Sequence, residues 1–263
     1  MNRFTRIALT AVVALILASG VASAQTSLRV GASPVPHSEI LELIQPILAA
    51  QGIDLEIVVF TDYVLPNLAL AEGELDANYF QHVPYLEQFS ADHGLDLTVV
   101  GGVHVEPIGL YSQNLTTLEG LPQGTQVAIP NDPSNSGRAL LLLEAAGLIG
   151  LADDAGLSAT SLDITDNPHG LRFIELEAAQ LPRSLADVGL AVINTNYALE
   201  AGLNPVQDAL ALEGAESPYV NVVVVQTGRE HEEVVAALID ALQSEHVREF
   251  IISTYEGAVV ATF

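Results

Sequence analysis

Residues 76–85 have the sequence DANYFQHVPY, which brings four aromatic or imidazole rings within seven residues of a chain that is only 5% aromatic. The stretch follows Gly73, which is expected to end a helix, and it contains Pro84, which suits the first turn of the next helix. Between them, Ala77–Phe80 predicts a short strand that leads into a loop. Ligands of open α/β sheets bind at this carboxyl end of the strands. The rings are therefore expected to line a small-molecule pocket, although any single ring could instead be core packing.

Apolar segments on both sides of this stretch alternate between strand-like and helix-like patterns. Expected strands are 28–31, 55–60, 77–80 and 97–103, and expected helices begin after Ser38 and span 65–70 and 84–92. This alternation predicts a parallel sheet covered by helices.

The pattern changes at 107–111, and a second α/β unit is predicted to begin with the strand 126–130. A turn-rich loop, 131–138, is expected to end at Arg138, which would open the helix 139–146. Later strands are expected at 162–164, 171–175, 189–193 and 220–225, and closing helices at 230–243 and 245–255. We predict an α/β fold with two lobes, two crossing segments and a ligand cleft between the lobes. Lobe 1 comprises 25–108 plus 218–263, and lobe 2 comprises 109–217.

The amino terminus, 1–24, has the pattern of a signal peptide. Two arginines precede the apolar run 7–18, and the small residues Ala22–Ala24 predict cleavage before Gln25. A membrane anchor is the alternative, but the apolar run is short for a spanning helix. We expect a periplasmic or otherwise extracytoplasmic protein. The sequence contains no cysteine, which excludes disulfides, thiolate metal sites, a thiol nucleophile and a lipid-bearing cysteine.

The charge balance is strongly acidic. All eight basic residues are arginines, and 33 residues are Asp or Glu. Two arginines lie in the predicted signal peptide, so the mature chain carries 6 − 33 = −27. Such a field repels nucleic acid and anionic membranes, and both are excluded as partners. We expect an acidic surface suited to high salt, where screening reduces self-repulsion.

Four polar residues are candidates for ligand binding. Arg138, placed beside free N–H groups at a helix start, would make a carboxylate site, and its alternative is a surface arginine. Asn194 ends a strand and either binds a ligand or caps the next helix. Asn221 interrupts an apolar strand, and its buried amide must bond to backbone or ligand. His82 suits a hydrogen-bonding wall residue. No metal, cofactor or catalytic motif is predicted.

Several segments together resemble the NlpA-type methionine-binding lipoproteins, the substrate-binding components of methionine ABC importers. They are FTDYVLPN (60–67), the stretch 76–85, PNDPSN (130–135) with Arg138, LEAAQLPRSL (176–185), AVINTNY (191–197) and ESPYVN (216–221). They extend over essentially all of the mature chain.

The resemblance implies a type II-like periplasmic binding protein that is a monomer, binds L- or D-methionine and serves a permease–ATPase complex. It implies that Arg138 holds the substrate carboxylate and that Asn194 and Asn221 hold the amino-acid head group. The implied side-chain pocket consists of Tyr63, Phe80, His82 and Tyr85, with Asn135 supporting the head-group loop. The family is typically anchored through a lipidated cysteine, which this chain lacks.

Two alternatives stay open. One is a binding protein for another apolar amino acid or a Met-containing dipeptide. The other is an extracytoplasmic hydrolase or lyase that uses His82 with Asp76 or Asp62, although the chain has no nucleophile motif.

Overall fold

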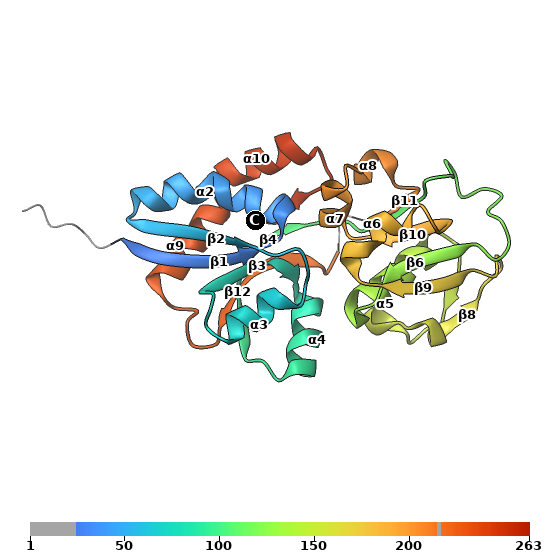
Figure 1. The fold of residues 1–263 in the computed structure, drawn as a ribbon, viewed down its shortest axis with the longest axis horizontal. Coiled ribbons are helices and arrows are strands. Elements are labelled where there is room, and N and C mark those ends of the chain that lie inside the picture. The colour runs from blue at the N-terminus through green and yellow to red at the C-terminus, as the bar shows by residue number, and fades with distance from the viewer. Residues whose placement is uncertain (1–24, 215–216) are drawn as a thin grey trace, which may run out of the picture.

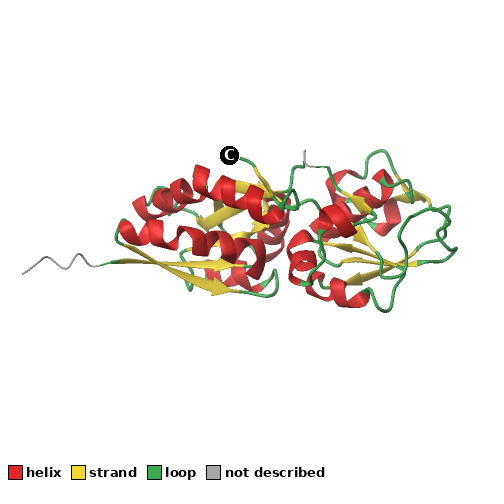
Figure 2. Cartoon of the chain, turned by 90° about the horizontal axis from the view of Figure 1, so that it is seen from above, coloured by secondary structure: helices red, strands yellow, loops and turns green. Residues whose placement is uncertain are grey.

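The computed structural model describes residues 25–214 and 217–263, and the predicted signal peptide lies outside them. Two α/β lobes lie end to end (Figure 1), which confirms the two-lobed prediction. Helices flank the strands in both lobes (Figure 2).

The first lobe is built on a six-stranded sheet with the order β13-β4-β12-β3-β1-β2. Its strands are β1 (Thr26–Ala32), β2 (Ile53–Val59), β3 (Ala77–His82), β4 (Leu97–Val105), β12 (Val220–Gln226) and β13 (Val260–Ala261). β1 pairs in parallel with β2 and β3, but β12 runs antiparallel between β3 and β4. The sheet is therefore mixed, because β12 returns from the second lobe and enters at the end where β4 leaves.

Helices cover both faces of this sheet. One face carries α2 (Glu39–Ala50), α9 (Glu233–Leu242) and α10 (Glu245–Tyr255), and a short helical turn at Pro34–Ser38 leads into α2. Their apolar side chains form one core with β1 and β3. The other face carries α3 (Leu65–Ala71) and α4 (Val83–His93), which pack on β12.

The ring-rich stretch extends further as a strand than predicted. β3 runs to His82 and passes directly into α4, so no loop separates them. Side chains alternate along the strand, and Tyr79 is buried in the first lobe's core, whereas Phe80 lies on the opposite side. The helix ends at Gly94, whose φ of 65° suits a glycine cap.

The second lobe is built on a five-stranded sheet with the order β11-β5-β10-β6-β9. Its strands are β5 (Gly109–Tyr111), β6 (Gln126–Pro130), β9 (Arg172–Leu176), β10 (Leu190–Ile193) and β11 (Ala211–Leu212), and a separate pair comprises β7 (Gly150–Leu151) and β8 (Ile164–Asp166). Its α-helices are α5 (Pro133–Ala145), α6 (Leu181–Ser184), α7 (Thr195–Glu200) and α8 (Pro205–Asp208). α5 packs in one apolar cluster, and α6 and α7 pack in another.

The prediction of a loop over 131–138 is wrong for most of its length, because these residues are helical from Pro133 onward. α5 begins at Pro133, and the side chain of Asp132 caps it by accepting the backbone N–H of Asn135 at 2.8 Å. An Asp–Pro pair supplies both an N-cap and a first helical residue. Arg138 consequently lies in the second turn of the helix, not at its start.

Candidate functional site

All eight residues predicted to bind substrate line one cavity between the lobes. The first lobe contributes Tyr63, Phe80, His82, Tyr85 and Asn221, and the second contributes Asn135, Arg138 and Asn194. The cavity is also lined by Gln81, Glu106, Thr195 and Asn196.

Three rings from three separate elements form the apolar wall. Tyr63 precedes α3, Phe80 lies on β3 and Tyr85 lies in the first turn of α4. Their ring centroids are 5.7 to 6.2 Å apart, and Tyr85 packs edge-on against the other two. This arrangement is favourable for aromatic groups. It gives the cavity one side suited to an apolar group.

His82 stands where the apolar wall meets the polar one. Its Nδ1 accepts the backbone N–H of Tyr85 at 3.2 Å, so it caps α4. Nε2 therefore carries the proton and donates to Asn135 Oδ1 at 3.1 Å. Burial and the nearby Arg138 charge lower the His82 pKa to about 3, which keeps the ring neutral. Both nitrogens are occupied, and the ring has no free lone pair to act as a base.

Asn135 connects the two lobes. Its Oδ1 accepts from His82 of the first lobe and, at 2.8 Å, from Asn194 Nδ2 of the second lobe. Its Nδ2 donates to the carboxylate of Asp132, 3.0 Å from each oxygen. Asn194 is the first residue before α7 but makes no side-chain cap there. The helix-capping alternative for Asn194 is therefore wrong.

Arg138 is buried, with 3% of its surface exposed, which rules out a surface arginine. Its Nε donates to Glu213 Oε1 at 3.0 Å, and Nη2 contacts the other Glu213 oxygen. Nη2 also donates to the Glu106 carbonyl oxygen at 2.8 Å, and the guanidinium lies 4.1 Å from the centroid of the Tyr219 ring. The edge of the guanidinium formed by Nε and Nη2 is therefore hydrogen-bonded to protein groups. Nη1 makes no hydrogen bond to any residue in the described ranges.

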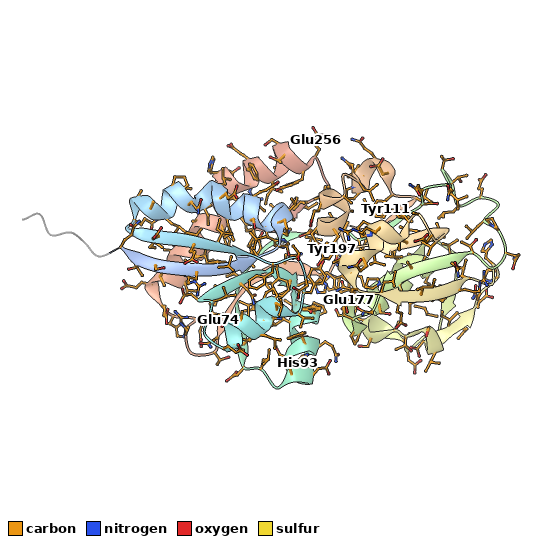
Figure 3. All side chains as sticks on the ribbon, viewed as in Figure 1. Glu74, His93, Tyr111, Glu177, Tyr197 and Glu256 are labelled. Carbon is orange, nitrogen blue, oxygen red and sulfur yellow. The ribbon has the colours of Figure 1, made fainter. Side chains whose placement is uncertain are left out.

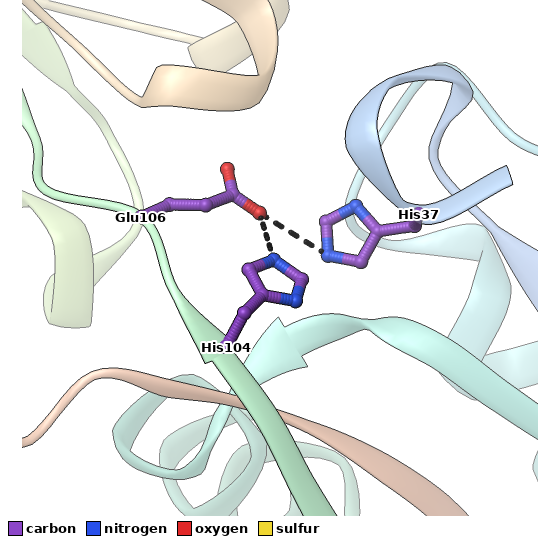
Figure 4. Close-up of side chains that lie close together, drawn as sticks. All are labelled: His37, His104 and Glu106. Atoms are coloured by element: carbon purple, nitrogen blue, oxygen red, sulfur yellow. Dashed lines mark hydrogen bonds and ion pairs between the residues drawn. The ribbon is translucent and has the colours of Figure 1, made fainter. Parts of the chain in front are cut away.

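Asn221 bonds to the side chain of His37, which is neither of the two partners, backbone or ligand, that the sequence analysis expected. His37 Nε2 lies 2.9 Å from Asn221 Oδ1 and 3.3 Å from Glu106 Oε1. His104 Nε2 lies 2.7 Å from the same Glu106 oxygen (Figure 4). Burial lowers the pKa of His37 to about 4 and of His104 to about 3, and it raises the pKa of the Glu106 carboxyl. Both imidazoles are neutral at pH 7.

Two buried polar atoms at the cavity have no hydrogen-bond partner among the described residues. They are Asn194 Oδ1, an acceptor, and Asn196 Nδ2, a donor. An unpaired polar atom in a buried site is costly unless a ligand or water satisfies it. The cavity therefore offers both donors and acceptors to an occupant, opposite its aromatic wall.

Tyrosines also join the lobes near the cavity. Tyr63 Oη donates to Asn196 Oδ1 at 2.5 Å, and Tyr197 Oη donates to the Thr61 carbonyl oxygen at 3.2 Å. Figure 3 shows Tyr197 where the two lobes meet. These two hydrogen bonds connect the lobes beside the cavity.

Within the described ranges, His37, His104 and Glu106 form the one group of side chains that brings three candidate metal-ligand atoms within 4.8 Å of one another. The separation of 2.7 Å between His104 Nε2 and Glu106 Oε1 is a hydrogen-bond distance. Two ligands on a tetrahedral ion, each about 2.0–2.1 Å from it, are about 3.3 Å apart. The arrangement is that of a hydrogen-bonded cluster.

Sequence patterns missed four lining residues. Asn196 and Thr195 belong to the segment 191–197, which carried the resemblance, but neither was assigned a role. Gln81 lies in the stretch 76–85 but was assigned no role, and Glu106 had no local signal beyond its position directly after a strand.

No helix in the described part of the chain is long and apolar enough to cross a membrane.

Residues 28–263 match the protein family described as NlpA lipoprotein. The D-methionine-binding lipoprotein MetQ of Escherichia coli strain K12 is 46% identical over 236 residues, which is 89% of this chain and 87% of that protein. The membrane lipoprotein TpN32 of Treponema pallidum is 44% identical over 232 residues, or 88% of this chain and 87% of that protein.

Solved structures agree with these relatives. A nutrient binding protein from Burkholderia cenocepacia bound to methionine has a TM-score of 0.87 and 46% identity, covering 90% of this chain and 100% of that one. The methionine binding protein MetQ has a TM-score of 0.88 and 45% identity, covering 90% and 98%. The resemblance drawn from the sequence is confirmed: the chain belongs to the NlpA lipoprotein family.

Proposed function

We propose that this protein is an extracytoplasmic solute-binding protein that captures methionine and delivers it to an ABC importer. The observation that carries the proposal is one cavity that combines an aromatic wall with buried Arg138, Asn194 and Asn221. An α-amino acid with an apolar side chain needs this combination. A thioether gains from aromatic contacts, and the zwitterionic head group needs charge-assisted hydrogen bonds in a closed site. The methionine-binding relatives support the choice of ligand.

Roles for the individual side chains follow from their positions. Arg138 Nη1 and the Asn221 amide are assigned to the carboxylate of methionine, and Asn194 to its ammonium group. Phe80, Tyr63 and Tyr85 are assigned to the thioether, with His82 at the border. Asn135 holds His82 and Asn194 in place.

Catalysis is not part of the proposal. The relatives are binding proteins, and an enzyme using His82 would need a free imidazole nitrogen. Both nitrogens of His82 are hydrogen-bonded, and its pKa is lowered by burial to about 3.

Several further features are proposed with this function. The partners are a permease and an ATPase, and the protein is a monomer that is exported after cleavage near Ala24. Lobe 1 is assigned to 25–108 plus 218–263 and lobe 2 to 109–217, because every strand of each sheet lies inside its assigned range. The mass of the exported protein tests the proposed cleavage site, and light scattering tests the proposed monomeric state.

Calorimetric titration with L- and D-methionine tests the function. We expect saturable binding of at least one enantiomer, and no heat with either would refute the proposal. Mass spectrometry of the ligand that co-purifies with the protein separates methionine from a Met-containing dipeptide or another apolar amino acid.

A further inference from the structure

Glu106 is a buried carboxylate at the point where the chain first leaves the first lobe. It lies between β4 and β5, has 5% of its surface exposed and lines the cavity. Its backbone carbonyl oxygen accepts a hydrogen bond from Arg138 Nη2 of the second lobe at 2.8 Å. The carboxylate is therefore placed at the cleft by groups from both lobes.

Two imidazoles hold one oxygen of this carboxylate. His104 Nδ1 lies 2.5 Å from the Tyr79 hydroxyl, which has no other partner among the described residues. The hydroxyl donates to Nδ1, so His104 Nε2 carries a proton and donates to Glu106 Oε1 at 2.7 Å. His37 Nε2 approaches the same oxygen at 3.3 Å. Figure 4 shows the second oxygen of Glu106 turned away from both rings.

Among the described residues, no cation is hydrogen-bonded to the Glu106 carboxylate, although the nearby Arg138 charge lowers the pKa of this carboxyl against the larger raising effect of burial. Arg138 pairs with Glu213, and its contact with Glu106 is to the backbone oxygen. Both imidazoles are neutral, since burial lowers the pKa of His37 to about 4 and of His104 to about 3. A buried carboxylate without a cationic partner is costly. A cation brought by the ligand would relieve that cost.

We propose that Glu106 is the counter-charge that selects the ammonium group of the ligand, with its second oxygen as the acceptor. Asn194 Oδ1, which has no partner among the described residues, supplies a second acceptor in the same cavity. His104 and His37 are positioning residues that fix the direction of the carboxylate. This inference rests on the proposed function, because it concerns the head group of an amino-acid ligand.

The test compares methionine with 4-(methylthio)butanoate, which has the same carboxylate and thioether but no ammonium group. Calorimetry measures both ligands against the unaltered protein and Glu106→Gln. We expect the unaltered protein to prefer methionine by about 30-fold or more, as for removal of one partner of a buried charge pair. In Glu106→Gln, the affinity for methionine should fall by a similar factor, while the affinity for 4-(methylthio)butanoate should change by less than about threefold.

Glu213→Gln is the matched control. It removes the same charge, but from a carboxylate that pairs with Arg138. The affinities for both ligands should therefore fall by a similar factor, because both ligands carry a carboxylate. Equal weakening of both ligands by Glu106→Gln would overturn the proposal, since Glu106 would then be structural. A preference below about threefold in the unaltered protein would also overturn it, without any variant. Methionine binding by the unaltered protein tests the proposed function separately.

Discussion

His82 Nε2 lies 3.1 Å from Asn135 Oδ1, and this hydrogen bond joins the two lobes at the cavity. The same oxygen accepts from Asn194 Nδ2 at 2.8 Å. Asn135 therefore orients two cavity residues at once, one from each lobe. Its own orientation is set by Asp132, which accepts from its side-chain nitrogen and from its backbone N–H.

Replacing Asn135 should loosen this arrangement. Asn135→Ala leaves the His82 N–H and the Asn194 amide without their acceptor, and each such loss costs about 1–3 kcal/mol in a buried site. We expect methionine to bind about 10- to 100-fold more weakly by calorimetry. Asn114→Ala, in an exposed loop, is the control and should bind as the unaltered protein does. Affinity within twofold in Asn135→Ala would show that the interlobe bond does not contribute.

Arg138 should contribute more than any other single side chain. Arg138→Ala removes a buried guanidinium and also leaves Glu213 without its partner. Truncating one member of a buried charge pair costs about 2–5 kcal/mol, so methionine affinity should fall by about 30- to 5,000-fold. Arg248→Ala removes a surface cation that pairs with Glu245 and should have no effect. Tight binding by Arg138→Ala would refute the carboxylate role.

Part of the site could be predicted from local patterns because several of its residues lie on strands of the two sheets or directly after them. Phe80 and His82 share a side of β3, as period-two alternation requires, while Asn194 directly follows β10. The carboxyl ends of strands from both lobes face the cleft. Local patterns therefore placed Phe80, His82 and Asn194 at one edge, whereas Tyr63 and Asn135 were assigned to the site only by the family resemblance.

Long-range partners were not predictable in this way. Glu213 is 75 residues from Arg138, and His37 is 184 residues from Asn221. Neither separation has a periodic signal, since each depends on how distant segments of one lobe pack together. The start of α5 was different: Asp132–Pro133 is a local cap signal, and the glycine and serines that follow it obscured it.

Three buried histidines should make the protein less stable in mild acid. His37, His82 and His104 have pKa values lowered to about 4, 3 and 3, against 6.5 when unfolded. Below pH 6.5 the unfolded chain binds protons on these histidines that the folded chain does not. The contribution of the three histidines to the free energy of unfolding is therefore complete above pH 6.5 and is lost as pH falls toward 3–4. Each should remove on the order of 2 kcal/mol of unfolding free energy between pH 7 and pH 5.

Urea unfolding at pH 7 and pH 5 measures this loss in the unaltered protein and in His104→Gln. Glutamine keeps a donor for Glu106 but does not titrate, so the loss should be smaller in the variant by on the order of 2 kcal/mol. The raised pKa of Glu106 acts with the opposite sign, favouring folding at lower pH. An equal loss in both proteins would mean that His104 is protonated in the folded state.

Salt should stabilise the mature protein. Its net charge is −27 once the predicted signal peptide is removed, and the described ion pairs engage Arg29, Arg138, Arg229 and Arg248. Most carboxylates are therefore left to repel one another, and screening weakens that repulsion. We expect the melting temperature to rise between low and molar sodium chloride. A melting temperature that stays constant or falls would refute the salt-adapted surface.

The position just before Arg138 should tolerate no side chain. A Cβ at Gly137 would lie 2.4 Å from the Leu157 carbonyl oxygen and 3.1 Å from the Ala159 nitrogen, both backbone atoms. Gly137→Ala must therefore push α5 away from this segment, at a cost of about 1–3 kcal/mol for overpacking. Because Arg138 is the next residue, methionine affinity should fall together with the urea midpoint. Gly214→Ala, whose Cβ meets nothing within 4 Å, should change neither, whereas a Gly137→Ala protein with unaltered stability would show that the segment at Leu157 can move aside freely.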